Sequence, residues 1–107
     1  MAQFRITHVC DVYHLTTTND TASYELTPSI TQLNASIYPA GTDILMTFPG
    51  IPAYSAYQML VWDDVEIKNG DKIISGSEEW IVRGVPRIFN DMTMYVQDII
   101  VERIFGS

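Results

Sequence analysis

DDVEIKNGDKIISGSEEWIVRGVPRIFN, residues 63–90 of this 107-residue chain, contains two turn signals that separate three short runs of β-forming residues. The first signal, Asn69-Gly70, suits a type I′ hairpin turn because both residues tolerate positive φ. The second is the Ser-Gly-Ser sequence of residues 75–77. Together the runs and turns predict a meander of three short strands.

A glycine and a proline follow the third run of this meander, Trp80–Val82. Gly84 predicts a β-bulge or a close approach of another backbone segment. Pro86 predicts an edge position or a strand end, because proline cannot donate a hydrogen bond to a central ladder.

Further strands are predicted on both sides of the meander. Residues 3–15 alternate in the way that a half-buried strand requires, and residues 35–38 form a short run that ends at a proline. Residues 53–62 read as a strand buried on both faces. Residues 92–105 are rich in β-branched and aromatic side chains, which favours a final strand over a short helix at 92–101. The sequence therefore predicts one all-β domain, residues 1–107, forming a small antiparallel barrel or sandwich with long loop and arm extensions.

Two segments do not fit this pattern and are the predicted extensions. Residues 16–34 are rich in Thr, Ser and Asn, and form either a loop or a hairpin arm with Tyr24–Leu26 in one leg. Residues 39–55 contain Pro and Gly together with several large apolar side chains. Because loops are normally polar, such a loop is expected to find a partner.

Composition and charge exclude several classes of protein. The chain is 47% hydrophobic with a net charge of −7, which is typical of a globular protein. Its six basic residues are scattered, so we do not expect a surface that grips nucleic acid. The single cysteine, Cys10, allows no intrachain disulfide, and the amino terminus lacks the apolar run of a signal peptide. The uncharged stretch 44–62 contains two prolines and a glycine at its centre, so we do not expect it to span a membrane.

Candidate catalytic and metal-binding residues are few. His8, Cys10 and His14 share one strand parity and offer nitrogen and sulfur ligands, but a zinc site needs a fourth ligand. Side chains two apart on a flat strand are separated by about 6–7 Å, which is too far for a Cys–His catalytic pair. The simplest interpretation is one buried thiol and two partly exposed histidines.

The densest acidic group also has a simple interpretation. Asp63, Asp64, Glu66 and Asp71 do not match the spacing of a calcium loop, and a solvated hairpin edge explains them better than paired acid and base groups. The two tryptophans, at 62 and 80, are expected to be buried anchors rather than a binding platform. No nucleophile elbow or phosphate loop is present in the sequence, so we expect a protein without enzymatic activity, cofactor or metal.

The meander resembles the small head-tail joining proteins of tailed bacteriophages. Residues 64–65, 69–73 and 80–86 carry this resemblance, together with residues 10–13 near the start and 37–39 in the middle. The residues of this motif are structural: Asn69, Gly70, Asp71, Trp80, Arg83, Gly84 and Pro86.

This resemblance implies a head-closure, or stopper, protein in the neck of a virion, assembled in the host cytoplasm. Such proteins are small β-barrels that form rings, here expected to be twelve-fold, between a portal-adaptor protein and a tail or tail-terminator protein. They close the DNA channel and dock the tail. The negative charge agrees, because DNA would slide through an acidic lumen without sequence-specific binding.

Closure of a ring needs two different patches on each subunit, and the two extensions are the candidates. The apolar loop is expected to contact a neighbouring subunit or to line the channel. Its candidate residues are Asp43, Ile44, Leu45, Met46, Phe48, Ile51 and Tyr54. The arm is expected to dock an adaptor or tail protein. Its candidate residues are Thr18, Asp20, Tyr24, Leu26 and Ile30.

Three other functions remain open on the sequence. A tail terminator or tail-completion protein would form a six-fold ring. A small β-barrel module that binds a peptide or sugar would remain a monomer and expose a tryptophan in a groove. A hydrolase would need a nucleophile beside a base, which the sequence does not offer.

Overall fold

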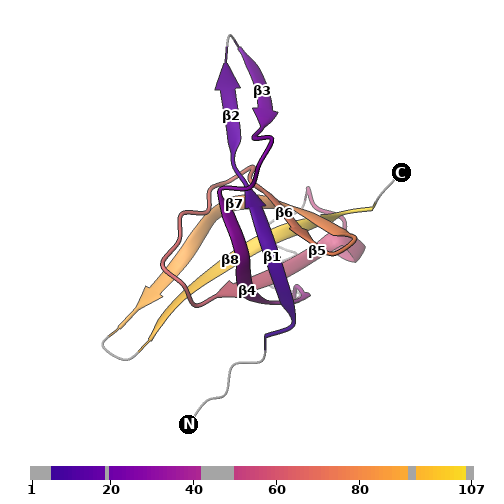
Figure 1. Ribbon diagram of the computed structural model, residues 1–107. Coiled ribbons are helices and arrows are strands. Elements are labelled where there is room, and N and C mark those ends of the chain that lie inside the picture. The colour runs from indigo at the N-terminus through magenta and orange to yellow at the C-terminus, as the bar shows by residue number, and fades with distance from the viewer. Residues whose placement is uncertain (1–5, 19, 42–49, 92–93, 106–107) are drawn as a thin grey trace.

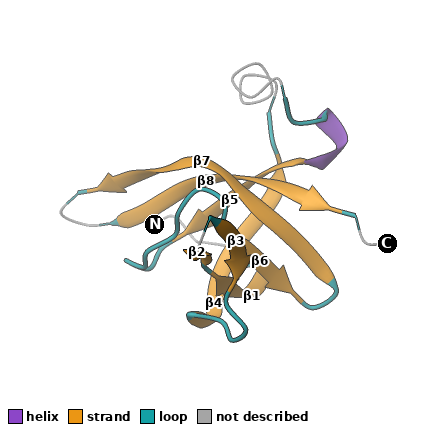
Figure 2. Ribbon diagram, turned by 90° about the horizontal axis from the view of Figure 1, so that it is seen from above, coloured by secondary structure: helices purple, strands orange, loops and turns teal. Residues whose placement is uncertain are grey.

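The computed structural model describes residues 6–18, 20–41, 50–91 and 94–105. In this part of the chain it contains eight strands, one short 3-10 turn and no α-helix (Figures 1 and 2). The elements in chain order are β1 (His8–Tyr13), β2 (Leu15–Thr18), β3 (Thr21–Tyr24), β4 (Ile30–Pro39), η1 (Ala53–Ser55), β5 (Ala56–Val61), β6 (Lys72–Ser75), β7 (Glu78–Asn90) and β8 (Tyr95–Ile104).

Six of these strands close into an antiparallel barrel in the order β1-β4-β5-β8-β7-β6. Strand β1 closes it, because its first part pairs with β4 and its last three residues pair with β6. The register of β1 against β4 shifts between Cys10 and Val12, and Gln32 opposite has a φ of 54°. This irregularity bends the two strands beside Val12, which pairs with both β4 and β6. The predicted all-β class is confirmed, and the structure selects the barrel over the sandwich.

Alternating side chains from the six strands fill the barrel. Trp80 and Met59 are its largest fully buried residues, so the prediction of a buried anchor is confirmed for Trp80, whereas Trp62 is only half-buried. Full burial of such side chains stabilises the fold by roughly 1.5–3 kcal/mol each. The buried cluster consists of Cys10, Val12, Leu33, Ala35, Ile37, Met59, Val61, Ile67, Ile73, Trp80, Val82, Ile99 and Val101.

The first strand of the predicted meander is absent, although its other two strands are present. Residues 63–69 belong to no strand, and Ile67 enters the core from this irregular segment. The turn that follows is not of type I′, because only Gly70 has a positive φ, of 95°. The Asp71 N–H donates to Lys68 O at 3.1 Å, which matches a type II turn with glycine at its third position. The β6–β7 hairpin turns at residues 76–77 as predicted.

Gly84 lies in a bulge, as predicted. Its φ is 80°, and the β7–β8 register shifts between Arg83 and Arg87. Asn69 Oδ1 accepts a hydrogen bond from the Gly84 N–H at 2.9 Å. Pro86 does not end the strand, because β7 continues through the bulge to Asn90. Residues 84–86 have no partners in the β7–β8 register, so the N–H that proline lacks is not needed for a ladder hydrogen bond there.

Two other strands begin at a different residue than predicted, β4 earlier and β5 later. Strand β4 begins at Ile30 and is ten residues long, so the predicted 35–38 strand is only its second half. Strand β5 begins at Ala56, because η1 takes up the three residues before it. The final strand is confirmed as β8, and the helical alternative is wrong.

Candidate docking and assembly surfaces

The β2–β3 hairpin forms an arm that stands away from the barrel (Figure 1). Its four pairs run from Leu15 opposite Tyr24 to Thr18 opposite Thr21. Asp20 lies in the turn with a φ of 65°, a conformation that aspartate tolerates better than most residues. The structure therefore selects the hairpin over a loop for this segment, but the hairpin ends at Tyr24 rather than at residue 34.

The predicted arm residues occupy three different environments. Asp20 lies at the tip, whereas Tyr24 lies at the base, where its hydroxyl donates to Gly70 O at 2.7 Å. Leu26 follows the hairpin and is 99% exposed. Ile30 is wrong as an arm residue, because it begins β4 and packs against the core. The side chain of Thr18 lies outside the described part.

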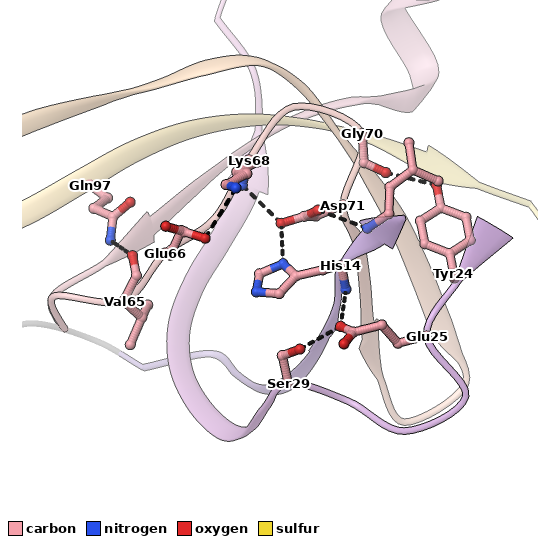
Figure 3. A network of polar contacts seen from close by, with 11 residues as sticks. His14, Tyr24, Glu25, Ser29, Val65, Glu66, Lys68, Gly70, Asp71 and Gln97 are labelled. Atoms are coloured by element: carbon pink, nitrogen blue, oxygen red, sulfur yellow. Dashed lines mark hydrogen bonds and ion pairs between the residues drawn. The ribbon is translucent and has the colours of Figure 1, made fainter. Parts of the chain in front are cut away.

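A buried carboxylate joins the base of the arm to the barrel (Figure 3). Asp71 is 2% exposed and accepts three hydrogen bonds. Its Oδ2 accepts from His14 Nδ1 and from the Lys68 N–H, both at 2.8 Å. Its Oδ1 accepts from the Leu15 N–H at 3.2 Å. Asp71 was predicted to lie on a solvated hairpin edge, and this prediction is wrong because its side chain is buried. The three donors compensate the free-energy cost of burying the carboxylate.

A second carboxylate, that of Glu25, holds the segment that leads from the arm back to the barrel. Glu25 Oε1 accepts from the Ser29 hydroxyl and, at 3.1 Å, from the His14 N–H. These two hydrogen bonds, the one from Ser29 first, lower the pKa of Glu25 below its usual value. The Glu25 N–H also donates to His14 O at 3.2 Å. Figure 3 shows that both carboxylates meet the chain around His14, at the joint between barrel and arm.

Lysine and tyrosine side chains complete the base of the arm. Lys72 Nζ lies 4.8 Å from the ring centre of Tyr24 and 5.2 Å from that of Tyr13, within the range of cation–π contact. Burial raises the pKa of Tyr24, so its hydroxyl stays protonated and remains a donor to Gly70. The base is therefore anchored by several independent contacts.

The His8, Cys10 and His14 group does not converge. Cys10 is fully buried, and burial raises the pKa of its thiol to about 11. His8 lies 3.2 Å from Glu78 and meets the ring of Trp80 edge-on, whereas His14 pairs with Asp71. Within the described residues, no group of three or more potential ligands could hold a metal ion.

An open groove of about 440 Å³ lies between the irregular segment after β5 and the β7–β8 ribbon. Gln97 holds this segment in place, because its Nε2 donates to Asp63 O at 3.1 Å and to Val65 O at 2.7 Å. The pKa of Tyr95 at the groove is raised, mainly by burial and to a lesser extent by a hydrogen bond with Asp64. The lining is mainly apolar with two carboxylates, and consists of Asp64, Val65, Glu66, Ile67, Val85, Pro86, Ile88, Tyr95 and Gln97.

A second exposed apolar site lies at the other end of β8. The rings of Tyr54 and Phe105 are 5.9 Å apart, and they are 72% and 54% exposed. The Arg103 guanidinium lies 5.0 Å from the ring centre of Phe105. Tyr54 was predicted as an interface residue, and its exposure leaves it available for that role.

The rest of the predicted loop site is only partly visible. Ile51 is half-buried. The other predicted loop residues, Asp43, Ile44, Leu45, Met46 and Phe48, lie outside the described residues. Arg83, from the scaffold motif, is exposed and forms an ion pair with Glu102 at 2.9 Å. In the part of the chain described here, no helix has the length and apolar character needed to cross a membrane.

Several of these contacts had no signal in the sequence. The Asp71–His14 pair joins residues 57 positions apart, and an aspartate after Asn-Gly is an ordinary turn residue. The hydrogen bonds of Gln97 hold one side of the groove in place. The alternation of apolar and polar residues predicts only that Gln97 lies in a strand. The Tyr54–Phe105 pair joins a loop residue to the end of the last strand.

Comparison with known proteins supports the fold. No protein-family model matches the sequence, and no curated protein matches it. Among solved structures, the phage-like element PBSX protein xkdH from Bacillus subtilis is similar, with a TM-score of 0.61 and 16% sequence identity. The match covers 94% of this chain and 96% of that protein. At this identity the likeness concerns the fold, which extends over almost the whole of both chains.

Proposed function

We propose that this chain is a structural protein of a phage or phage-like particle, and that it forms a head-closure ring in the neck. The observation that carries the proposal is the shared fold with a phage-like element protein over 94% of the chain. A fold alone is compatible with many functions, so the proposal also rests on the head-tail joining motif in the sequence and on the surfaces described above.

The arm is the proposed docking element. It is a two-stranded hairpin with a mostly exposed surface, and an isolated hairpin is marginally stable in water. Its base is held by Asp71, Tyr24 and Glu25, which fixes the direction in which it leaves the barrel. An anchored base with an exposed tip suits a segment that contacts a portal-adaptor or tail protein.

The apolar loop at residues 39–55 is proposed to contact the neighbouring subunit or to face the channel. Its described ends lie side by side, because the Ala40 N–H after β4 donates to Ala56 O, the residue after η1, at 3.1 Å. The net charge of −7 supports a channel role, since an acidic lumen lets DNA pass without holding it. We propose no catalytic step for this protein.

The test is the symmetry of the assembled protein. The purified chain, alone and mixed with a portal-adaptor complex, would be examined by light scattering and by electron microscopy. A twelve-fold ring on the adaptor supports the head-closure role, and a six-fold ring supports a tail terminator. A chain that stays monomeric at millimolar concentration and binds no adaptor contradicts both.

One observation favours a second candidate, a peptide- or sugar-binding module. The groove between the 63–67 segment and β7–β8 is open and mainly apolar, as many ligand sites are. Trp80, however, is 1% exposed and contributes nothing to a binding surface. A stable monomer that binds a ligand in this groove would replace the ring proposal.

A further inference from the structure

Two exposed apolar sites on this chain differ in the charge that accompanies them. The first, here called the aromatic end, consists of Tyr54, Phe105 and Arg103. It presents two exposed rings and one cation. The Arg103 guanidinium also bonds Glu78 at 3.1 Å, so its charge is partly compensated within the chain.

The second site, here called the acidic groove, is concave and carries the opposite charge. Val85 and Ile88 line it and are 86% and 57% exposed. Asp64 and Glu66 supply carboxylates, of which Glu66 pairs with the exposed Lys68 at 3.3 Å. Exposed apolar side chains gathered in one hollow usually mark a surface that is covered in the assembled state.

The two sites lie at opposite ends of one strand. Tyr95, the first residue of β8, lines the groove, and Phe105 follows its last residue. A strand of ten residues at 3.3 Å per residue is roughly 30 Å long. In Figures 1 and 2 the two ends of β8 lie on opposite sides of the molecule. The sites therefore cannot meet within one chain.

We propose that the aromatic end of one subunit packs into the acidic groove of the next copy of this chain, with Arg103 facing Asp64 and Glu66. Both sites belong to the same chain, and they are complementary in charge, because one carries the Arg103 guanidinium and the other the carboxylates of Asp64 and Glu66. Two different patches at opposite ends make a head-to-tail contact, which closes into a ring or extends into a filament. This inference rests on the proposed ring and names its subunit interface.

Cross-linking tests this contact directly. Cys10 is fully buried, so an introduced cysteine is the reactive thiol in each variant. The cysteines are placed beside the two sites, so that the contact residues stay intact: Met94 precedes Tyr95 of the groove, and Pro52 lies two residues before Tyr54, and both are exposed. Met94→Cys, Pro52→Cys and the double variant would be treated with a short bismaleimide in the assembled state, alone or on the adaptor complex. The double variant should give a ladder of dimers, trimers and higher species, whereas each single variant should give monomers. The matched control is the Leu26→Cys/Pro52→Cys pair, because Leu26 is exposed, as Met94 is, but lies beside the arm.

Mixing complementary variants gives a second test. Val85→Lys puts a charge in the groove that repels Arg103 and keeps the aromatic end, and Phe105→Ser does the reverse. Each alone should fail to assemble, and an equimolar mixture should stop at dimers, because only one productive contact remains. Both residues are exposed, so the variants should keep the wild-type circular dichroism spectrum.

The outcomes separate this inference from the ring itself. If wild type forms a ring and both variants do so equally well, the ring proposal stands and this interface is wrong. If single-cysteine variants cross-link to dimers, the contact is face-to-face and the head-to-tail proposal is overturned. If wild type forms no assembly alone or on the adaptor, the proposed function fails and this inference fails with it.

Discussion

His14 and Asp71, which are 57 residues apart in the sequence, meet at 2.8 Å between Nδ1 and Oδ2 at the base of the β2–β3 arm. The same carboxylate accepts from Lys68 N and Leu15 N. It therefore ties the end of β1, the start of the arm and the turn before β6 together. A single buried side chain thus joins three segments at the point where the arm leaves the barrel.

Replacing this carboxylate tests its importance. In Asp71→Asn one acceptor oxygen becomes an NH₂ group, so at least one buried donor loses its partner. We expect a loss of about 1–3 kcal/mol in the free energy of unfolding, measured with urea. Asp63→Asn is the control, because Asp63 is exposed and should change stability by no more than about 0.5 kcal/mol. Equal losses of stability in the two variants would contradict the role of Asp71 as the buried acceptor of three hydrogen bonds.

Tyr24→Phe should loosen the arm and leave the barrel intact. It removes one hydrogen bond, from the hydroxyl to Gly70 O, and keeps the ring beside Lys72. We expect a loss of about 0.5–1.5 kcal/mol. Hydrogen exchange should become faster for amides of β2 and β3 and stay unchanged for β8. Faster exchange throughout the barrel would show that the hydroxyl supports the whole fold instead.

Glu25 should titrate below the usual glutamate pKa of about 4.3. Because folding lowers this pKa, the interaction stabilises the fold above about pH 4.3 and is lost as the pH falls through the lower value. Carbon-detected NMR would follow the carboxyl group directly. Ser29→Ala removes the first cause of the shift and should raise the Glu25 pKa toward its usual value. An unchanged pKa in that variant would mean that Ser29 does not hold the carboxylate.

Cys10 should be inert in the folded protein. Its thiol is buried, and its pKa of about 11 leaves very little thiolate at pH 8. A disulfide reagent should therefore react at least 100-fold more slowly with the native chain than with the chain in urea. Rapid reaction in the native state would revive a role for this cysteine in chemistry.

Local pattern predicted the strands whose side chains alternate between core and solvent. In β1, Cys10 and Val12 face the core, and the alternation was visible because the neighbours are polar or exposed. The segment around Val65 and Ile67 shows the same alternation for another reason. This segment is irregular and is held in place by Gln97, and its apolar side chains pack against the core. The sequence therefore alternates as a strand does, although no strand forms.

The surfaces were less predictable than the strands, because they depend on contacts between distant parts of the chain. The hairpin arm was one of two alternatives, since its Thr and Ser residues suit a loop equally well. Its end was misplaced because Ile30 begins a long strand whose outward residues are polar. Asp71 was assigned to solvent because its three donors come from His14, Leu15 and Lys68, which only the folded chain brings together.

Gly70 should resist substitution because of its backbone conformation. Its φ of 95° strains any residue with a Cβ, and an added Cβ would lie 3.1 Å from Leu15 Cδ2 at the base of the arm. We expect Gly70→Ala to lower the free energy of unfolding by about 1–2 kcal/mol. Gly50→Ala is the matched control, since its Cβ would meet nothing within 4 Å.

Gly70→Asn separates the two causes of this loss. Asparagine tolerates positive φ better than alanine but carries the same Cβ. A smaller loss in Gly70→Asn than in Gly70→Ala means that backbone strain dominates. Equal losses, together with faster hydrogen exchange in the arm, mean that the contact with Leu15 dominates. If Gly70→Ala were as stable as Gly50→Ala, the type II turn at residues 68–71 would be wrong.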